Sequence, residues 1–446
     1  MNLLGKAQGT LTVLRNVPGQ RRATYLPREQ LLAHRDERVR ETVEYAAATV
    51  PYYRDVFRSQ GIDPREIRTA DDLERLPLLD KLELRADPLR LVSTSDRAGD
   101  AVVYRTVGTT GVPVEIRHDR TSLFEGVAHS ERERAIECRF VGKRVRYTRM
   151  SISDTTGTGN QTRAFYRGGM LAPVRPKHSS LSVSAPLEET IAAVNSVQPD
   201  VIRSYGSYLE LLYGTVVAKR LRLHRPKLIV YGGDRLTARG RALIESTVGV
   251  PVVSRYNCVE SFKIGFFCEE RRGFHLHEDL CHVRIVDPQG QTVPDGRHGE
   301  VVISNLVNRG TVLLNYRLGD LATIVTEPCA CGRTTRILSE LEGRVSEFIL
   351  LEDGTMFTPT MLADLMEPHG DVIRYQLVQI EKDRFDLQLV TADEASFAQV
   401  AGPLAADVSR LLGGAPVEPT YHDSAGSPQV GKFMRITALP TDEPPG

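Results

Sequence analysis

The stretch Thr106-Val107-Gly108-Thr109-Thr110-Gly111-Val112-Pro113 follows an apolar run, Ala101 to Tyr104, that predicts a strand. Threonine hydroxyls and backbone N–H groups between two glycines can donate hydrogen bonds to one anion, so the stretch indicates a phosphate-binding loop. It is not of the Walker type, because no Gly-Lys-Ser/Thr sequence ends it. A polar hairpin turn is the alternative, since Val114 to Arg117 reads as a return strand and short glycine motifs often bind nothing.

The composition is that of a large globular protein with more than one domain. The chain has 446 residues, of which 41% are hydrophobic and 26% charged. Lys+Arg and Asp+Glu both number 57, so no net charge attracts nucleic acid or an anionic membrane, and a small-molecule substrate is favoured. No apolar run approaches the roughly 20 residues of a membrane span, and the N-terminus has too short a hydrophobic stretch for a secretory signal. We therefore expect a cytoplasmic protein.

The order of the predicted elements indicates an α/β fold. Helices and short apolar strands alternate in the middle of the chain, which predicts a parallel sheet with helices on both faces. A β-rich region follows from Gly273, and about 100 residues after Gly343 read as a small α+β domain. The predicted helices are short ones between Arg28 and Leu84, then Arg120–Phe140, Leu209–Leu221, Pro359–Met366 and Ala395–Leu412; the predicted strands are Val201–Tyr205, Leu228–Tyr231, His282–Val286, Glu300–Ile303, Thr311–Leu314, Tyr375–Glu381, Phe385–Val390 and Val417–His422.

Three strand ends carry residues suited to a nucleotide. Gly232-Gly233-Asp234 follows a predicted strand, where ligands of parallel sheets bind, and could lie against adenine or ribose. Tyr256 can stack on a base, and Glu260 can hold Mg²⁺. Asp320, in Tyr316-Arg317-Leu318-Gly319-Asp320, could accept both ribose hydroxyls, although an ion pair at a turn is the alternative.

Two further glycine-containing loops stand out. Thr155 to Asn160 reads as a flexible surface loop. Ser424 to Arg435 is a Gly-rich loop that presents Lys432. A loop lysine usually serves solubility, but one that follows a hinge can enter the active site of a neighbouring domain.

In this order the motifs resemble those of the adenylate-forming superfamily of acyl-coenzyme A ligases, and specifically its phenylacetate-coenzyme A ligase-like branch. The matching segments are Thr106 to Pro113 (Ser/Thr-Ser-Gly-Thr-Thr-Gly-x-Pro), Tyr256 to Glu260 (Tyr-Gly-x-x-Glu, in part), Tyr316 to Asp320 (Tyr-Arg-x-x-Asp), Gly343 to Glu347 (Gly-Arg-x-x-Asp/Glu) and Gly431-Lys432. The resemblance covers nearly the whole chain.

The resemblance implies an N-terminal adenylation domain over residues 1–342, a hinge at 343–347 and a small mobile C-terminal domain over 348–446. It also implies a reaction in which ATP and a carboxylic acid form acyl-AMP and pyrophosphate, after which coenzyme A takes the acyl group. The implied roles are phosphate binding by Thr106, Gly108, Thr109, Thr110 and Gly111; adenine contacts by Gly232, Gly233, Asp234, Tyr256 and Asn257; ribose binding by Asp320; Mg²⁺ binding by Glu260; and catalysis by Lys432 with Glu260 and Arg344.

Several residues depart from the family pattern. Asn257 replaces a glycine, Val107 a serine and Val112 a lysine, and Ser346 stands where the hinge often has aspartate. Two alternatives therefore stay open beside the acyl-CoA ligase: transfer of the acyl group to an amine or a carrier protein, and an inactive nucleotide-binding homologue. The family suggests an aryl or arylacetic acid as substrate, and a homodimer is among the states it allows.

Five of the six cysteines fall between Cys258 and Cys331, in the same stretch as His275, His277 and His282. Clustering of this kind suggests a metal more than disulfides in a reducing compartment. Cys-x-Cys-Gly is a tight turn that can give two thiolates to one ion, but the spacing is not that of a standard zinc finger, and free buried cysteines are the alternative. The branch that the chain resembles carries a structural zinc, which here implies Cys268, His275, Cys329 and Cys331 as ligands, with His277, Cys281 and His282 as runners-up.

Overall fold

The computed structural model describes residues 2–105, 114–171, 177–344, 347–351, 356–422 and 433–439. The chain divides into two compact units, and neither is continuous in sequence. The first unit comprises Met1–Arg139, Thr158–Val174 and Arg255–Glu340; the second comprises Phe140–Gly157, Arg175–Ser254 and Leu341–Gly446. The expected division at residues 342 and 348 stays a prediction.

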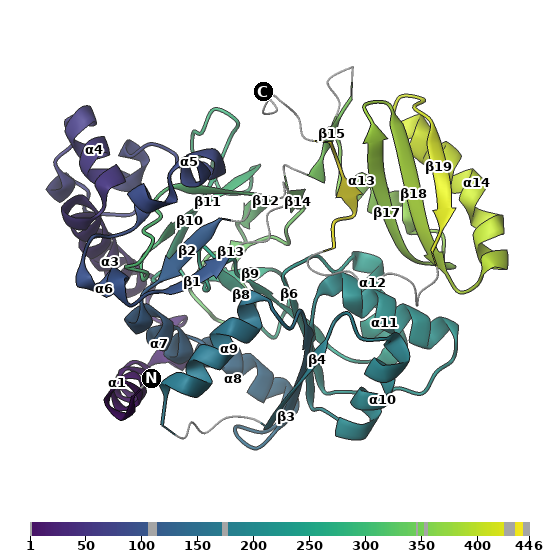
Figure 1. The fold of residues 1–446 in the computed structure, drawn as a ribbon, viewed down its shortest axis with the longest axis horizontal. Helices are drawn as coiled ribbons and strands as arrows, with labels where there is room; N and C mark the ends of the chain where they lie inside the picture. The colour runs from purple at the N-terminus through teal and green to yellow at the C-terminus, as the bar shows by residue number, and fades with distance from the viewer. Residues whose placement is uncertain are drawn as a thin grey trace. The chain divides into compact units, whose positions relative to one another are not determined.

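The first unit is built on an antiparallel sheet in the order β10-β11-β12-β13-β9-β8 (Figure 1). All six residues of β10 are buried, including the polar His282 and the charged Arg284. Its strands are β8 (Gly265–Phe267), β9 (Phe274–Leu276), β10 (Cys281–Val286), β11 (His298–Asn305), β12 (Tyr316–Val325) and β13 (Ile337–Leu338), and β1 (Val102–Arg105) pairs with β2 (Glu115–His118) in a separate hairpin.

The same unit also contains α-helices. Its α-helices are α1 (Leu3–Asn16), α2 (Gln20–Ala23), α3 (Arg28–Thr49), α4 (Pro51–Gln60), α5 (Lys81–Ala86), α6 (Asp96–Gly99), α7 (Arg120–His129), α8 (Glu131–Val141) and α9 (Thr158–Gly169). The Asp119 side chain caps α7 by accepting a hydrogen bond of 3.1 Å from the backbone N–H of Ser122.

Three predictions for this unit are wrong. The helix expected over Arg120–Phe140 is broken at Ser130, whose hydroxyl donates back to the Gly126 carbonyl, a bond that competes with helix continuation. The loop expected at Thr155–Asn160 becomes helix from Thr158, because the residues that follow supply a packing face that includes Phe165. Thr311–Leu314 is not a regular strand, since its backbone N–H groups bond to several different segments.

The second unit contains a parallel sheet in the order β7-β6-β5-β3-β4 (Figure 1). Apolar residues of its strands, such as Ile202 and Ile229, share one core with Leu209 and Tyr213 of α11. The elements are β3 (Thr148–Ser153), β4 (Lys177–Ser182), α10 (Leu187–Val197), β5 (Val201–Ser204), α11 (Gly206–Ala218), β6 (Leu228–Gly232), α12 (Ala238–Ala242) and β7 (Val252–Tyr256), whose last two residues belong to the first unit. These elements agree with the predicted α/β class.

The C-terminal part of this unit forms a smaller sheet in the order β19-β18-β17-β20, with α13 and α14 packed on its core. Strand β17 pairs antiparallel with β18, whereas β19 and β20 join in parallel. The elements are β14 (Gly343–Arg344), β15 (Ile349–Leu350), β16 (Met356–Phe357), α13 (Pro359–Met366), β17 (Val372–Glu381), β18 (Arg384–Thr391), α14 (Glu394–Leu411), β19 (Val417–Tyr421) and β20 (Ile436–Thr437).

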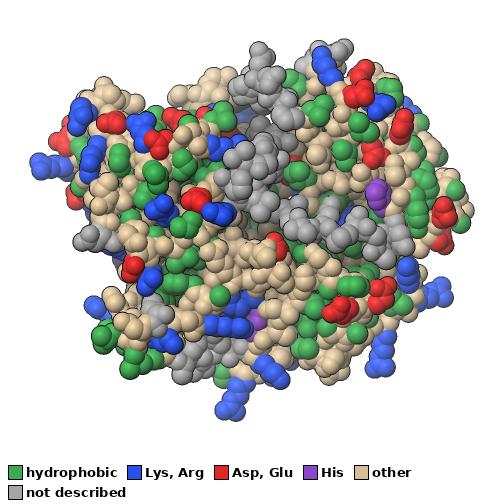
Figure 2. Space-filling view, in the orientation of Figure 1, with side chains coloured by type: hydrophobic (Ala, Val, Ile, Leu, Met, Phe, Trp, Pro, Cys, Tyr) green, Lys and Arg blue, Asp and Glu red, His purple; other side chains and the backbone are tan. Residues whose placement is uncertain are grey.

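The surface reflects the balanced composition. Basic and acidic side chains both occur over the face that Figure 2 shows. Among the described residues, no helix has the length and apolar character that a membrane span requires.

Candidate nucleotide and metal sites

Tyr256 and Asp320 are brought together in the first unit, although 64 residues separate them in sequence. The Tyr256 hydroxyl, at the end of β7, donates a hydrogen bond of 2.7 Å to Oδ2 of Asp320 on β12. Both residues are buried. The neighbouring Arg317 forms an ion pair with Glu300, with the charged groups 2.9 Å apart.

Glu260 lies in the loop that follows Tyr256 and is also buried. The Tyr316 hydroxyl lies 3.5 Å from its Oε1. Burial, and then the Glu260 carboxylate, raise the pKa of Tyr316, so the phenol stays protonated and can donate. A carboxylate held in this way fits Mg²⁺, which proteins commonly bind through one or two carboxylates together with substrate phosphates. Asn257, in the same loop, is exposed.

Gly232, Gly233 and Asp234 follow β6 in the second unit. Gly233 has a φ of +92°, and a Cβ at this position would come within 2.9 Å of the Tyr205 ring, so the turn favours glycine. The Asp234 carboxylate accepts hydrogen bonds from the hydroxyl and the backbone N–H of Ser207, the latter at 3.2 Å. Burial raises the pKa of Asp234 to about 6, against the lowering effect of the Ser207 bonds.

Some predicted site residues lie outside the described residues. These are Thr106, Gly108, Thr109, Thr110, Gly111 and Lys432. Of the predicted hinge, Gly343 and Arg344 form β14 and Glu347 is described.

The segment that follows Lys432 is anchored within the second unit. Arg435 is buried and pairs with Glu210 of α11, and its guanidinium lies 4.9 Å from the centre of the Tyr375 ring. Glu210 also accepts a hydrogen bond of 2.5 Å from the backbone N–H of Thr237. The Glu210–Arg435 pair therefore fixes Arg435, three residues after the predicted catalytic lysine, to the helix that packs on the parallel sheet.

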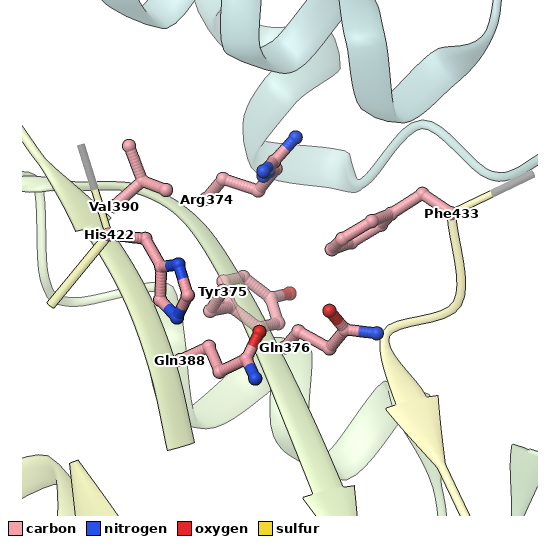
Figure 3. A pocket seen from close by; sticks show the side chains of 7 residues that line it. All are labelled: Arg374, Tyr375, Gln376, Gln388, Val390, His422 and Phe433. Carbon is pink, nitrogen blue, oxygen red and sulfur yellow. The ribbon is translucent and has the colours of Figure 1, made fainter. Parts of the chain in front are cut away.

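A hollow lies on the small C-terminal sheet, shown in Figure 3. The guanidinium of Arg374 lies 5.0 Å from the centre of the Phe433 ring. The lining residues are Arg374, Tyr375, Gln376, Gln388, Val390, His422 and Phe433. None of the predicted site residues that the structure describes lines this hollow.

The four predicted zinc ligands form one cluster in the first unit. The sulfur atoms of Cys268, Cys329 and Cys331 and one ring nitrogen of His275 all lie within 4.8 Å of one another. The Sγ atoms of Cys268 and Cys329 are 3.7 Å apart. A tetrahedral Zn²⁺ with bonds of about 2.3 Å to sulfur has an edge of roughly 3.8 Å, so this spacing fits zinc.

The protonation of His275 also suits a metal. Nδ1 of His275 lies 3.1 Å from the Thr335 hydroxyl, while Nε2 lies 3.3 Å from Sγ of Cys331. Burial lowers the pKa of His275 to about 4, so the imidazole is neutral. With Nδ1 engaged by Thr335, Nε2 is the nitrogen that can ligate, an arrangement typical of metal-binding histidines.

The runners-up do not belong to this cluster. His277 Nε2 lies 3.5 Å from Glu133 instead, and burial lowers the pKa of His277 to about 4. Cys281 is buried on β10, where burial raises the pKa of its thiol to about 12.

Three residues near the predicted site were missed from the sequence: His118, Glu133 and Glu210. Glu133 accepts from both Arg255 and Lys263, which flank the loop that carries Glu260. Glu210 gives a detectable signal, because it is the one charged residue in the sequence from Leu209 to Ala218. His118 and Glu133 give no such signal in the sequence, since each forms a hydrogen bond with a residue more than 100 positions away.

Comparisons with known proteins agree with the motifs. No protein-family model matches the chain. The chain is 26% identical to phenylacetate-coenzyme A ligase of Thermus thermophilus over 94% of its own length and 95% of the relative. A crystal structure of 2-hydroxyisobutyryl-CoA ligase in the postadenylation state, in complex with 2-HIB-AMP, has a TM-score of 0.73 at 18% identity and covers 93% of this chain and 91% of that one. The same ligase with 2-HIB-AMP and CoA, in the thioesterification state, has a TM-score of 0.61 at 19% identity, with coverage of 93% and 91%.

The fold is therefore that of the adenylate-forming CoA ligases, and the predicted α/β class is confirmed. Within that class, the sequence is similar over nearly its whole length to phenylacetate-coenzyme A ligase, as the motifs led us to expect.

Proposed function

We propose that this protein is an ATP-dependent acyl-coenzyme A ligase that activates an aryl or arylacetic acid. The observation that carries the proposal is the similarity to phenylacetate-coenzyme A ligase over 94% of the chain. The Tyr256–Asp320 hydrogen bond and the buried Glu260 carboxylate support it, because buried carboxylates in the first unit are groups of the kind that ribose hydroxyls and Mg²⁺ require.

In the first half-reaction, a carboxylate oxygen of the acid attacks the α-phosphorus of ATP. The bond to the bridging oxygen of the β-phosphate breaks, so pyrophosphate leaves and acyl-AMP remains. We assign charge neutralisation at the α-phosphate to Lys432 and ribose binding to Asp320. The protein contributes mainly by positioning and electrostatic stabilisation.

In the second half-reaction, the sulfur of coenzyme A attacks the acyl carbon after the thiol loses its proton. The bond from the acyl carbon to AMP breaks, giving the thioester and AMP. Between the two steps, residues 348–446 rotate about the hinge from Arg344 to Glu347 in the mechanism that we propose. This rotation removes Lys432 from the site. A hinge of a few residues at the end of an element is the usual means of such motion.

We propose two metals with different duties. Mg²⁺, when bound at Glu260 with the ATP phosphates, supplies positive charge against the pyrophosphate, which matters here because Val112 stands where the family has a lysine. Zn²⁺ in the Cys268, His275, Cys329 and Cys331 cluster is structural. All four of its ligand positions come from protein side chains, so no position is left for substrate.

The test of the function is ATP–pyrophosphate exchange by the purified protein with a panel of aryl, arylacetic and aliphatic acids. We expect exchange that depends on an aryl or arylacetic acid and, after addition of coenzyme A, a thioester detected by its mass. Exchange without thioester formation would shift the assignment to an amine or carrier-protein acceptor. No exchange with any acid would contradict the proposed function.

A further inference from the structure

The loop from Asn257 to Lys263, which carries Glu260, is fastened at both ends to one carboxylate. Arg255 Nη1, just before the loop, lies 2.9 Å from Oε2 of Glu133 on α8. Lys263 Nζ, at its end, lies 2.7 Å from Oε1 of the same residue. All three side chains are largely buried, so these contacts restrict where the loop begins and ends.

The middle of the loop is held by His118, the last residue of β2. Nε2 of His118 lies 2.7 Å from the carbonyl oxygen of Val259, which directly precedes Glu260. A carbonyl oxygen can only accept, so Nε2 carries the hydrogen and donates. On the other side, the side-chain amide of Asn305 donates to the Glu260 carbonyl at 2.9 Å. The backbone on either side of the Glu260 side chain is thus fixed.

Stacking adds a second contact between hairpin and loop. The His118 ring lies on the Phe262 ring with centroids 4.3 Å apart and planes at 19°. Tyr104, on β1, meets both rings edge-on, at 5.5 Å and 5.2 Å. Hydrogen bond and stack together join the β1–β2 hairpin to the loop. By sequence, the connection between these two strands contains the predicted phosphate-binding residues 106–113.

The chemistry of His118 excludes a role as a charged group. Its side chain is buried, and burial lowers the pKa of the imidazole to about 4. The ring is therefore neutral at physiological pH. What it offers is a fixed N–H donor and a flat face.

We propose that His118 is a positioning residue, which fixes the loop 257–262 and the Glu260 carboxylate to the β1–β2 hairpin and so sets the site's affinity for magnesium-bound nucleotide. The inference rests on the function proposed above for Glu260. Loss of the fastening removes no side chain that we assign to substrate or metal, but it lets the Glu260 backbone move, so a higher Mg²⁺ concentration is needed to organise the site.

Two substitutions separate the hydrogen bond from the stack. His118→Phe keeps an aromatic face for Phe262 but cannot donate to Val259, whereas His118→Gln keeps an N–H donor without a ring. We expect the Mg²⁺ concentration for half-maximal ATP–pyrophosphate exchange to rise about tenfold in His118→Phe, as loss of a buried hydrogen bond implies. The rate at saturating Mg²⁺ and ATP should change less than about twofold, and His118→Gln should lie between wild type and His118→Phe.

His282→Phe is the matched control, because His282 is another buried histidine whose charged neighbours, Arg35, Arg284 and Arg336, do not belong to the loop. It should leave the half-saturating Mg²⁺ concentration unchanged. A merely structural role for His118 would reduce the folded fraction, lowering the maximal rate without moving that concentration. That result would overturn the proposal.

Amide hydrogen exchange tests the fastening without turnover. We expect faster exchange at residues 257–262 in His118→Phe than in wild type or in the His282→Phe control. Unchanged exchange in this loop would overturn the inference even if the enzyme is active. Conversely, a wild type that activates no acid would contradict the proposed function, while the exchange data would still decide whether His118 fastens the loop.

Discussion

At the residue scale, Asp234 gives the stability a predictable pH dependence. Its pKa is raised to about 6, so the folded state binds the proton more tightly than the unfolded chain, where a carboxyl titrates near 3.9. The folded state therefore loses stability as pH rises from about 4 to above 6. We expect Asp234→Asn to gain stability over wild type across this range, by on the order of 1–2 kcal/mol at pH 7.5, because the residue is partly exposed.

The measurement is urea unfolding of wild type and Asp234→Asn at pH 4.5 and 7.5. The difference between the two proteins should be small at the lower pH and larger at the higher one. An equal difference in the free energy of unfolding at the two pH values would contradict the prediction that burial destabilises the charged Asp234 carboxylate.

The Tyr256–Asp320 hydrogen bond yields a second prediction at this scale. Tyr256→Phe deprives a buried carboxylate of its 2.7 Å donor, so we expect the free energy of unfolding to fall by about 1–3 kcal/mol. AMP should also bind more weakly, since Asp320 loses the group that orients it. Calorimetric titration with AMP and urea unfolding give the two values.

Tyr213→Phe is the control for this substitution. Tyr213 is equally buried, and its hydroxyl has no hydrogen-bond partner among the described residues. Removing that hydroxyl should cost little. Equal losses in the two variants would mean that the Tyr256 hydroxyl does nothing specific for Asp320.

At the scale of elements, the Glu210–Arg435 pair joins α11 to the segment just before β20. Arg435→Met leaves a buried carboxylate unpaired, and we expect a loss of about 3–5 kcal/mol in the free energy of unfolding. Because Arg435 is three residues from Lys432, which we assign to the α-phosphate in the first half-reaction, pyrophosphate exchange should fall more than thioester formation from preformed acyl-AMP.

An exposed ion pair serves as the control for the effect of burial on an Arg→Met substitution. Arg410 and Asp407 on α14 lie 2.9 Å apart with exposed side chains, so Arg410→Met should change stability by less than about 1 kcal/mol. The double variant Glu210→Met/Arg435→Met should recover part of the loss, since no charge is then left unpaired. If it is no more stable than Arg435→Met, the pair is not the cause.

Elements with strong local signals were predictable from the sequence. Apolar runs such as Leu228–Tyr231 and the helical pattern after Ala395 correspond to β6 and α14 within a few residues. The predicted elements that differ from the structure lie where tertiary contacts determine the backbone conformation. The helix ends at Ser130, whose hydroxyl shares the Gly126 carbonyl with the Ser130 backbone N–H. The backbone N–H groups of Val312 and Leu314 donate to Leu91 and Tyr53 rather than to a neighbouring strand.

The site was predictable to a similar degree. The Cys-x-Cys turn and the resemblance together identify the four residues that the structure brings into one cluster. The partner of Asp320 could not be deduced, because no local pattern links residues 64 positions apart. The partners of Glu133 could not be deduced for the same reason, since Arg255 and Lys263 lie more than 100 residues further along the chain.

At the scale of the whole molecule, the cluster joins two distant stretches of the first unit. We expect zinc at about one ion per chain by metal analysis. Removing it with a chelator should lower the melting temperature, because binding to the native state alone stabilises that state. Cys331→Ser should reduce both zinc content and melting temperature.

Cys138→Ser is the matched control, since Cys138 is a buried thiol outside the cluster. It should retain zinc. An untreated protein without zinc, or a Cys331→Ser variant with unchanged zinc content and melting temperature, would contradict the structural-zinc assignment.

The wide sequence spacing of the cluster has a consequence during synthesis. Cys268 leaves the ribosome 61 residues ahead of Cys329. At about 5–20 residues per second, the nascent chain carries one thiol and one imidazole of the site for roughly 3–12 seconds before the other two ligands arrive. For the zinc site proposed here, coordination by all four ligands therefore has to wait until Cys331, the last of the four residues, has been synthesised.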